Sequence, residues 1–328
     1  MNWLVWRQYR AQGAIALGLL AAFTAIALWQ GLQVASQWHS LVATCAGNDG
    51  CLREGDLISG VANGVPYLTL AVPIALGALL GAPLVASELE SRTSDFAWAQ
   101  SVTRVRWLAV KTGWLLLTAA VCGGVVAALV TWWSGPENAQ LANTFITPQF
   151  DTQGIVPIGY AVFAVALGIA AGAVTRRTLP AIAIVFGGFI GLRYVIDDFV
   201  RPHLMAAVTT YYSLTGSFSN PPGAIWTLSQ GMVSPTGQVV SYAVPDMYNS
   251  TLPASCQSLL PSLGPVKGGS QSMNGVYSCL RAHGWRGFTT YQPASRWWPF
   301  QGIETGIYVL LAAALVAVAF MVVRRRDA

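Results

Sequence analysis

The sequence has little charge and few of the residues that catalyse reactions. Only 9% of its 328 residues are charged, whereas ordinary soluble domains hold roughly a quarter. Its three histidines form no H-E-x-x-H pair, which excludes a common zinc-hydrolase pattern. A G-x-S-x-G turn and a G-x-x-x-x-G-K-[ST] phosphate loop are also absent, since the nearest glycine cluster, at 264–270, has another order. We therefore expect no enzymatic activity, no metal site and no cofactor bound directly by this chain.

Long apolar runs dominate what remains. The chain is 54% hydrophobic, and about twenty consecutive apolar residues are enough to cross the hydrocarbon layer of a membrane as a helix. Six runs of this kind predict six transmembrane helices in an all-α integral membrane protein. They cover residues 13–34, 66–86, 108–133, 155–175, 179–200 and 302–323.

The orientation follows from the basic residues between the runs, because Lys and Arg near span ends resist translocation. Eleven lie in the segments that six spans place on the side of the termini, and six lie in the opposite segments. We expect a multi-pass protein of the cell membrane with both termini in the cytoplasm. The basic residues are scattered between apolar runs, so we expect contact with lipid and none with nucleic acid.

This orientation divides the chain into three parts. Residues 1–200 would hold the first five spans and a cytoplasmic connection at 87–107. Residues 201–301 would form an extracellular region, because they are rich in Pro, Gly, Ser and Asn and contain no run that crosses the bilayer. Residues 302–328 would form the sixth span and a basic cytoplasmic tail.

The cysteines agree with this arrangement. Cys45 and Cys51 fall in the first outside loop, and Cys256 and Cys279 fall in the last one. Cys122 lies within a span. Disulfides persist in oxidising compartments, so two outside disulfides are one interpretation and four free thiols are the other.

The cytoplasmic connection at 87–107 is longer than two packed helices need. Acidic, basic and aromatic side chains alternate along it. A surface helix that a soluble partner binds and a solvated helix with ordinary charge pairs fit this pattern equally well. The residues that would contact a partner are Glu88, Glu90, Arg92, Phe96, Trp98 and Arg104.

The N-terminal segment combines aromatic and basic residues. Trp3 and Trp6 stand beside Arg7 and Arg10, as in helices that lie at the level of the lipid headgroups. The same residues also fit a simple flank of the first span.

Charges within the fifth span need their own explanation, since ionisable residues are costly in a membrane. Arg193 and Asp197 are four residues apart, with Asp198 beside them. Residues four apart share one face of a helix and can pair. A structural ion pair is the first interpretation, and a place in the exit path of a substrate is the second.

Four segments of the sequence stand out: ASELESRT at 86–93, WAQSVTRVRWLAVK at 98–111, GIVPIGY at 154–160 and YQPASRWWPFQGIE at 291–304. They resemble segments of actinobacterial ABC transporter permeases of the type-2 exporter class. The resemblance covers most of the chain outside 204–290 and carries no information about the substrate.

The resemblance implies two further structural elements and two partner subunits. It implies an interfacial elbow helix at 2–12, a coupling helix at 88–106 that binds a separate ATP-binding subunit, and a second permease, identical or different. ATP and Mg²⁺ would bind to that partner subunit. The region 201–301 is longer than is usual in the class.

Two functions follow as expectations. The first is an exporter that moves an amphipathic compound, such as a drug, an antibiotic, a peptide or a lipid, out of the cell. The alternative is a mechanical transmitter that couples ATP hydrolysis in the cytoplasm to an extracellular partner through the region 201–301.

Overall fold

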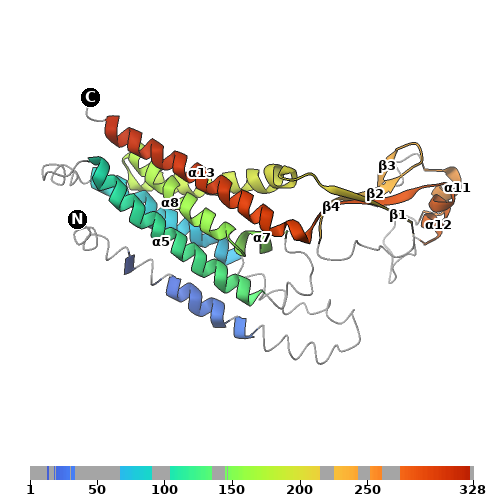
Figure 1. Cartoon of the computed structure of the whole chain (residues 1–328), viewed down its shortest axis with the longest axis horizontal. Coiled ribbons are helices and arrows are strands. Elements are labelled where there is room, and N and C mark those ends of the chain that lie inside the picture. Colours follow the sequence, from blue (N-terminus) through green and yellow to red (C-terminus); the bar gives the residue numbers. More distant parts are fainter. Residues whose placement is uncertain are drawn as a thin grey trace. The chain divides into compact units, whose positions relative to one another are not determined.

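We describe a computed structural model of the chain (Figure 1). The description covers residues 13–14, 18, 20–29, 31–33, 67–90, 104–134, 145, 147–214, 225–242, 252–260 and 274–325. These residues separate into two compact units. The membrane unit runs up to Leu204 and resumes at Trp297, and the second unit lies mainly between Met205 and Arg296.

The membrane unit contains five helices that are long and apolar enough to cross a bilayer among the described residues. They confirm five of the six expected spans with small shifts of their ends. A shorter apolar helix, Leu20–Gln33, lies within the first expected span, so a sixth crossing stays a prediction. The five helices are Tyr67–Ser87, Val105–Trp132, Val156–Thr175, Thr178–His203 and Ala294–Arg324.

Several of these spans are built from more than one element. The first of these five spans, which is the second run predicted from the sequence, contains a wide π turn, η2 (Gly77–Gly81), before α3 (Ala82–Glu90). Next come α5 (Arg104–Trp133), the short α7 (Gln149–Thr152) and α8 (Val156–Thr175). The fourth of the five spans, which is the fifth run predicted from the sequence, joins α9 (Thr178–Val195), the π turn η3 (Ile196–Val200) and the 3₁₀ turn η4 (Arg201–His203). We call it the fourth span from here on. The last span is α13 (Trp297–Arg324), after the 3₁₀ turn η5 (Ala294–Arg296).

The α8 helix forms the core of the membrane unit. It packs against α3, α5, α9 and α13, and Figure 1 shows it between α5 and α13. In an apolar 18-residue stretch of α8, 72% of the residues are buried, whereas the share in the corresponding stretch of the last span is 22%. Trp114, Leu117 and Val121 of α5 are exposed, and apolar side chains on the outside of a bundle are typical of helices in a membrane.

Small residues let α8 approach the first span closely. Gly77 and Gly81 stand four apart in η2, and Gly168 and Gly172 stand four apart in α8. A Cβ atom on Gly168 would lie 2.5 Å from the carbonyl oxygen of Gly77. This is the small-xxx-small packing of membrane helices, in which backbones touch because no side chain separates them.

The second unit contains a four-stranded antiparallel sheet in the order β1-β4-β2-β3. The strands are β1 (Val208–Ser213), β2 (Ile225–Val233), β3 (Val239–Ser241) and β4 (Arg286–Pro293). The described residues of the unit also form two helices, α11 (Ala254–Gln257) and α12 (Asn274–Ala282). The expected all-α fold therefore describes the membrane unit, while the region that was expected to be extracellular contains a sheet, which the all-α expectation did not include.

A disulfide between Cys256 and Cys279 joins α11 to α12. It lies at the edge of an apolar core in which Met232 from β2 and Leu280 from α12 are buried. Cys122 is a buried free cysteine of α5. Cys45 and Cys51 lie outside the described residues, so their expected disulfide stays a prediction.

Replacing Gly168 by alanine tests the close packing. The added methyl group would meet the backbone of η2, which cannot move without displacing the helix, and overpacking of this kind costs about 1–3 kcal/mol. We expect Gly168→Ala to lower the unfolding temperature of the purified protein in detergent.

Gly191→Ala is the matched control, because Gly191 lies in α9 with nothing within 4 Å of its added Cβ. Alanine favours a helix over glycine by about 1 kcal/mol, so this variant should be neutral or more stable. Equal unfolding temperatures for the two variants would contradict the packing argument.

Candidate functional site

Five charged side chains meet at the end of the membrane bundle where the fourth span finishes and α13 begins. Buried charges are costly unless each finds a partner of opposite sign. Three of the five, Asp151, Arg201 and Glu304, are at most 1% exposed. We call the set the ion cluster; its members are Asp151 of α7, Arg193 of α9, Asp197 of η3, Arg201 of η4 and Glu304 of α13.

Arg201 is the centre of the ion cluster. Its Nε lies 2.8 Å from Glu304 Oε2 and its Nη2 lies 2.9 Å from Glu304 Oε1, a two-pronged contact. The same guanidinium group also donates to Asp151 and Asp197. Planar, bidentate pairs of this kind fix orientation as well as charge. One arginine thus ties η4 to α7, η3 and α13.

Asp151 receives a second guanidinium, that of Arg193. Thr147 donates to Asp151 Oδ2 at 2.8 Å, and its hydroxyl also lies 2.7 Å from Asp197 Oδ2. Burial by itself would raise the pKa of the Asp151 carboxyl, but Arg201, Arg193 and the Thr147 hydrogen bond together lower it below its ordinary value. Asp151 is therefore an anion over the physiological range.

Two neutral side chains complete the contacts of the ion cluster. The hydroxyl of Tyr160 in α8 lies 2.9 Å from Asp151 Oδ1 and 2.8 Å from Glu304 Oε1. The ring of Phe150 stacks against the Arg201 guanidinium, with 4.3 Å between the ring centre and Cζ, a cation–π contact. The central helix α8 is in this way attached to the ion cluster.

Gln301 of α13 holds the start of α8. The first amides of a helix have no partner inside it, and α8 has no capping side chain of its own. Gln301 Oε1 accepts hydrogen bonds from the backbone N–H of Ile155 and Val156, both at 3.0 Å. Its Nε2 donates to the carbonyl of Phe150 at 2.9 Å. α13 therefore supplies the cap of α8 and a contact to α7.

Among the described residues, the ion cluster connects several helices and encloses too little space for a substrate. The cavity beside Asp151 and Tyr160 measures about 10 Å³, which is no more than a single water requires. Its hydrogen bonds and ion pairs run between α7, α8, the fourth span and α13. These elements must therefore move together at this end of the bundle.

These ion pairs differ from the pair between Arg193 and Asp197 that their spacing of four residues favoured. Arg193 contacts Asp151, and Asp197 contacts Arg201. Asp198 is exposed. Asp151 stands 42 positions before Arg193, so only the folded chain reveals that partner.

Few of the residues proposed to contact a partner can be located. Arg92, Phe96 and Trp98 lie outside the described residues, as do the elbow segment 2–12 and most of the coupling segment. Glu88 lies in α3 and Arg104 begins α5, where the backbone alone is described.

Glu90 is described, and it ends α3. Its Oε2 lies 3.1 Å from the hydroxyl and 3.4 Å from the backbone nitrogen of Thr178. A carboxylate at this position also suits the positive end of the α9 dipole. Glu90 therefore connects the end of α3 to the first residue of α9.

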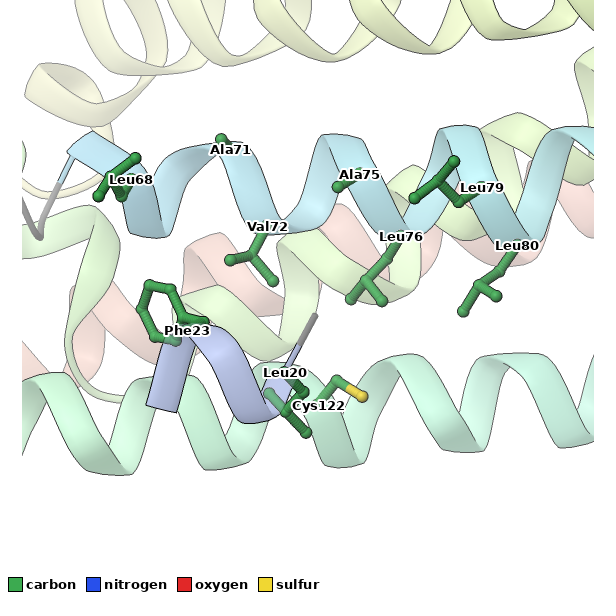
Figure 2. Close-up of a pocket in the computed structure, with 10 residues that line it drawn as sticks. All are labelled: Leu20, Phe23, Leu68, Ala71, Val72, Ala75, Leu76, Leu79, Leu80 and Cys122. Atoms are coloured by element: carbon green, nitrogen blue, oxygen red, sulfur yellow. The ribbon is translucent and has the colours of Figure 1, made fainter. Parts of the chain in front are cut away.

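An apolar pocket lies on another part of the membrane unit (Figure 2). It has a volume of about 170 Å³. The first apolar helix contributes Leu20 and Phe23, the next span contributes leucines, alanines and a valine, and α5 contributes Cys122. No charged side chain is among these lining residues, so the pocket suits a hydrocarbon chain.

Sequence reasoning missed most of the ion cluster. Glu304 was visible as an acid inside an apolar run, and Tyr160 and Glu304 both stood in segments that carried the family resemblance. Asp151 and Gln301 gave no such signal, because their roles depend on partners far away in the chain.

Comparison with known proteins identifies one family. The family described as ABC-2 membrane transporter related matches residues 17–201, which is more than half of the chain. No curated protein and no solved structure matches. The matched range includes every member of the ion cluster except Glu304.

Replacing Asp151 by asparagine tests the charge balance of the ion cluster. Removing one partner of a buried ion pair costs about 3–5 kcal/mol, so we expect a lower unfolding temperature at neutral pH. Because the folded pKa of Asp151 is lowered, its stabilisation is complete above the unfolded value of about 3.9 and is lost as the pH falls toward the folded value. The gap between wild type and Asp151→Asn should therefore narrow in acid.

The measurement is thermal unfolding in detergent from neutral pH down to about pH 3, below the unfolded pKa. Asp198→Asn, at an exposed position, serves as the control and should follow the wild type at every pH. A gap for Asp151→Asn that keeps the same width across the range would contradict the assignment.

Proposed function

The chain belongs to the ABC-2 membrane transporter related family, and we propose that it works as the membrane subunit of an ATP-driven exporter. The family makes it a permease subunit of an ABC transporter. The observation that carries the proposal is the family match over a bundle of long apolar helices. The proposal includes the outward direction of transport and the cytoplasmic location of both termini. It also includes the likeness of the four segments to actinobacterial permeases.

ATP hydrolysis takes place on a separate subunit in this proposal. The sequence has no phosphate loop of its own, and ATP and Mg²⁺ bind to the partner. The partner contacts the segment 87–107 through Glu88, Glu90, Arg92, Phe96, Trp98 and Arg104. A second permease, identical or different, encloses the pathway with this chain.

The fourth span is the element that carries motion from the docking segment to the ion cluster. At one end Thr178 contacts Glu90 of α3. At the other end Arg193 and Arg201 hold α7 and α13. A displacement of α3 by the ATP-binding subunit is passed to α9, and the ion cluster then moves α7, α8 and α13 as one body.

The substrate in this proposal is amphipathic. The pocket in Figure 2 supports an apolar part, because its described lining is hydrocarbon apart from the Cys122 thiol. A membrane lipid could occupy the same pocket instead of the substrate, since the lipid and the amphipathic substrate share an acyl or alkyl chain.

The second unit favours the alternative function, a mechanical transmitter. It has a sheet, a disulfide and an apolar core of its own, which is more than a connection between two spans requires. In this version ATP-driven motion of the bundle acts on an external partner through the second unit, and no compound crosses the membrane.

Changing Glu90 tests the docking segment. We expect Glu90→Ala, alone or with Glu88→Ala, to reduce the amount of ATP-binding subunit that co-purifies with this chain in mild detergent by several-fold. The reason is the removal of a charge from the proposed interface, because the loss of one partner of a charge pair weakens association. Mass spectrometry and ATPase activity of the purified complex give the readout.

Thr178→Val is the matched control. It removes the hydroxyl that contacts Glu90 inside this chain but leaves the carboxylate free for a partner, so co-purification should be retained. A reduction in both variants would assign the effect to the α3–α9 contact instead of docking. Purification without any nucleotide-binding subunit or ATPase activity would overturn the proposed function.

A further inference from the structure

The second unit is basic and almost without acids. Between Met205 and Arg296 the sequence has four basic residues, Lys267, Arg281, Arg286 and Arg296, and a single acid, Asp246. Arg296 is engaged within the unit, since its Nη1 lies 2.6 Å from Gln292 Oε1 and also contacts the carbonyl of Ala206. Arg281 and Arg286 are exposed, and neither side chain has an ion pair or hydrogen bond among the described residues.

These two arginines line the same pocket. It has a volume of about 390 Å³, which falls in the range of small-molecule sites. It lies where the end of β1, the end of α12 and the start of β4 meet. No acid is among the described residues that line it, which include Tyr211, Tyr212, Arg281, Trp285 and Arg286.

The turn between α12 and β4 fixes the spacing of the arginines. Gly284 has a positive φ of 79°, its N–H donates to the carbonyl of Arg281 at 3.0 Å, and the N–H of Trp285 donates to that of Leu280 at 3.0 Å. This is a Schellman motif, with the expected apolar contact between its two ends in the buried core.

The strand pairing of Arg286 with Ser213 holds the other side of the pocket. With the turn fixed as well, the pocket walls are present before any ligand binds.

The two tyrosines of β1 differ in their surroundings, because neighbouring residues of a strand point to opposite faces of the sheet. A Cβ on Gly287 would lie 2.4 Å from the ring of Tyr212, so that ring lies directly on the backbone of β4. The Tyr212 hydroxyl is 2.9 Å from that of Tyr242. Tyr211 is 60% exposed and presents an aromatic surface without being part of the core.

We propose that this pocket binds a ligand carrying a phosphate group next to an aromatic or apolar body. Arg281 and Arg286 bind the phosphate, because guanidinium groups match its oxygens in pairs. Tyr211, which is 60% exposed, contacts the apolar body. A soluble phosphorylated compound and the headgroup of an anionic phospholipid share this chemistry.

A purely structural role explains only one of the arginines. Arg281 lies in the last turn of α12, where a cation stabilises the helix dipole. Arg286 begins a strand and has no helix end to neutralise. Two arginines in one pocket, with no partner and no acid among the described residues around them, are therefore better explained by an anionic ligand.

Calorimetric titration of the full chain in an uncharged detergent with phenyl phosphate tests the site. We expect one site per chain, and in Arg281→Gln/Arg286→Gln each replaced guanidinium should weaken binding by about tenfold or more. Arg286→Gln alone leaves the α12 dipole intact and should weaken binding by about tenfold even if the double variant fails to fold. Arg177→Gln, an exposed arginine of the membrane unit, is the matched control and should bind as the wild type does.

A second titration with inorganic phosphate separates the two halves of the site. Tyr211→Ser should weaken phenyl phosphate and leave inorganic phosphate unchanged. Absence of millimolar binding, an unchanged affinity in Arg286→Gln, or an equal weakening in Arg177→Gln would each overturn the proposal.

Mixed micelles of phosphatidic acid then identify the source of the phosphate. Displacement of phenyl phosphate points to a lipid headgroup, and its absence points to a soluble ligand. Both results retain the site, whose existence is decided by the arginine variants.

Discussion

The contact between Arg201 and Glu304 is the constraint to which the rest of the membrane unit conforms. A guanidinium group that is 1% exposed cannot remain charged in a bundle of apolar helices unless several acceptors surround it. Those acceptors come from α7, η3 and α13, so the chain must bring three separate segments to one point. The hydroxyl of Tyr160 also contacts Glu304 and so connects α8 to the same point. Together these contacts fix the positions of the helices at this end of the bundle.

The other half of the unit is held together in a different way. Between η2 and α8 the contact depends on glycines that bring two backbones together, with hydrocarbon around them. The fourth span contacts α3 through Thr178 and the ion cluster through Arg201, and so joins the two halves.

Local patterns in the sequence predicted the spans, because apolar length is a property of a continuous segment. They also predicted that Cys256 and Cys279 lie in the region outside the spans, where the structure pairs them. The sheet was missed, because β1 and β4 are separated by about seventy residues and each is short and polar on one face. Arg193 was seen as a charge but given the wrong partner, since helical spacing reports only neighbours four residues away. Gln301 as a cap for α8 depends entirely on the packing of α13.

A double-mutant cycle on Arg201 and Glu304 tests the central claim most directly. Unfolding free energies in detergent would be compared for wild type, Arg201→Met, Glu304→Gln and the double variant. Each single change strands a buried charge or polar group, whereas the double change removes the pair together, so the account predicts a coupling energy of about 1.5 kcal/mol or more. Additive effects, with a coupling within about 0.5 kcal/mol of zero, would contradict it and leave the bundle held by its apolar packing alone.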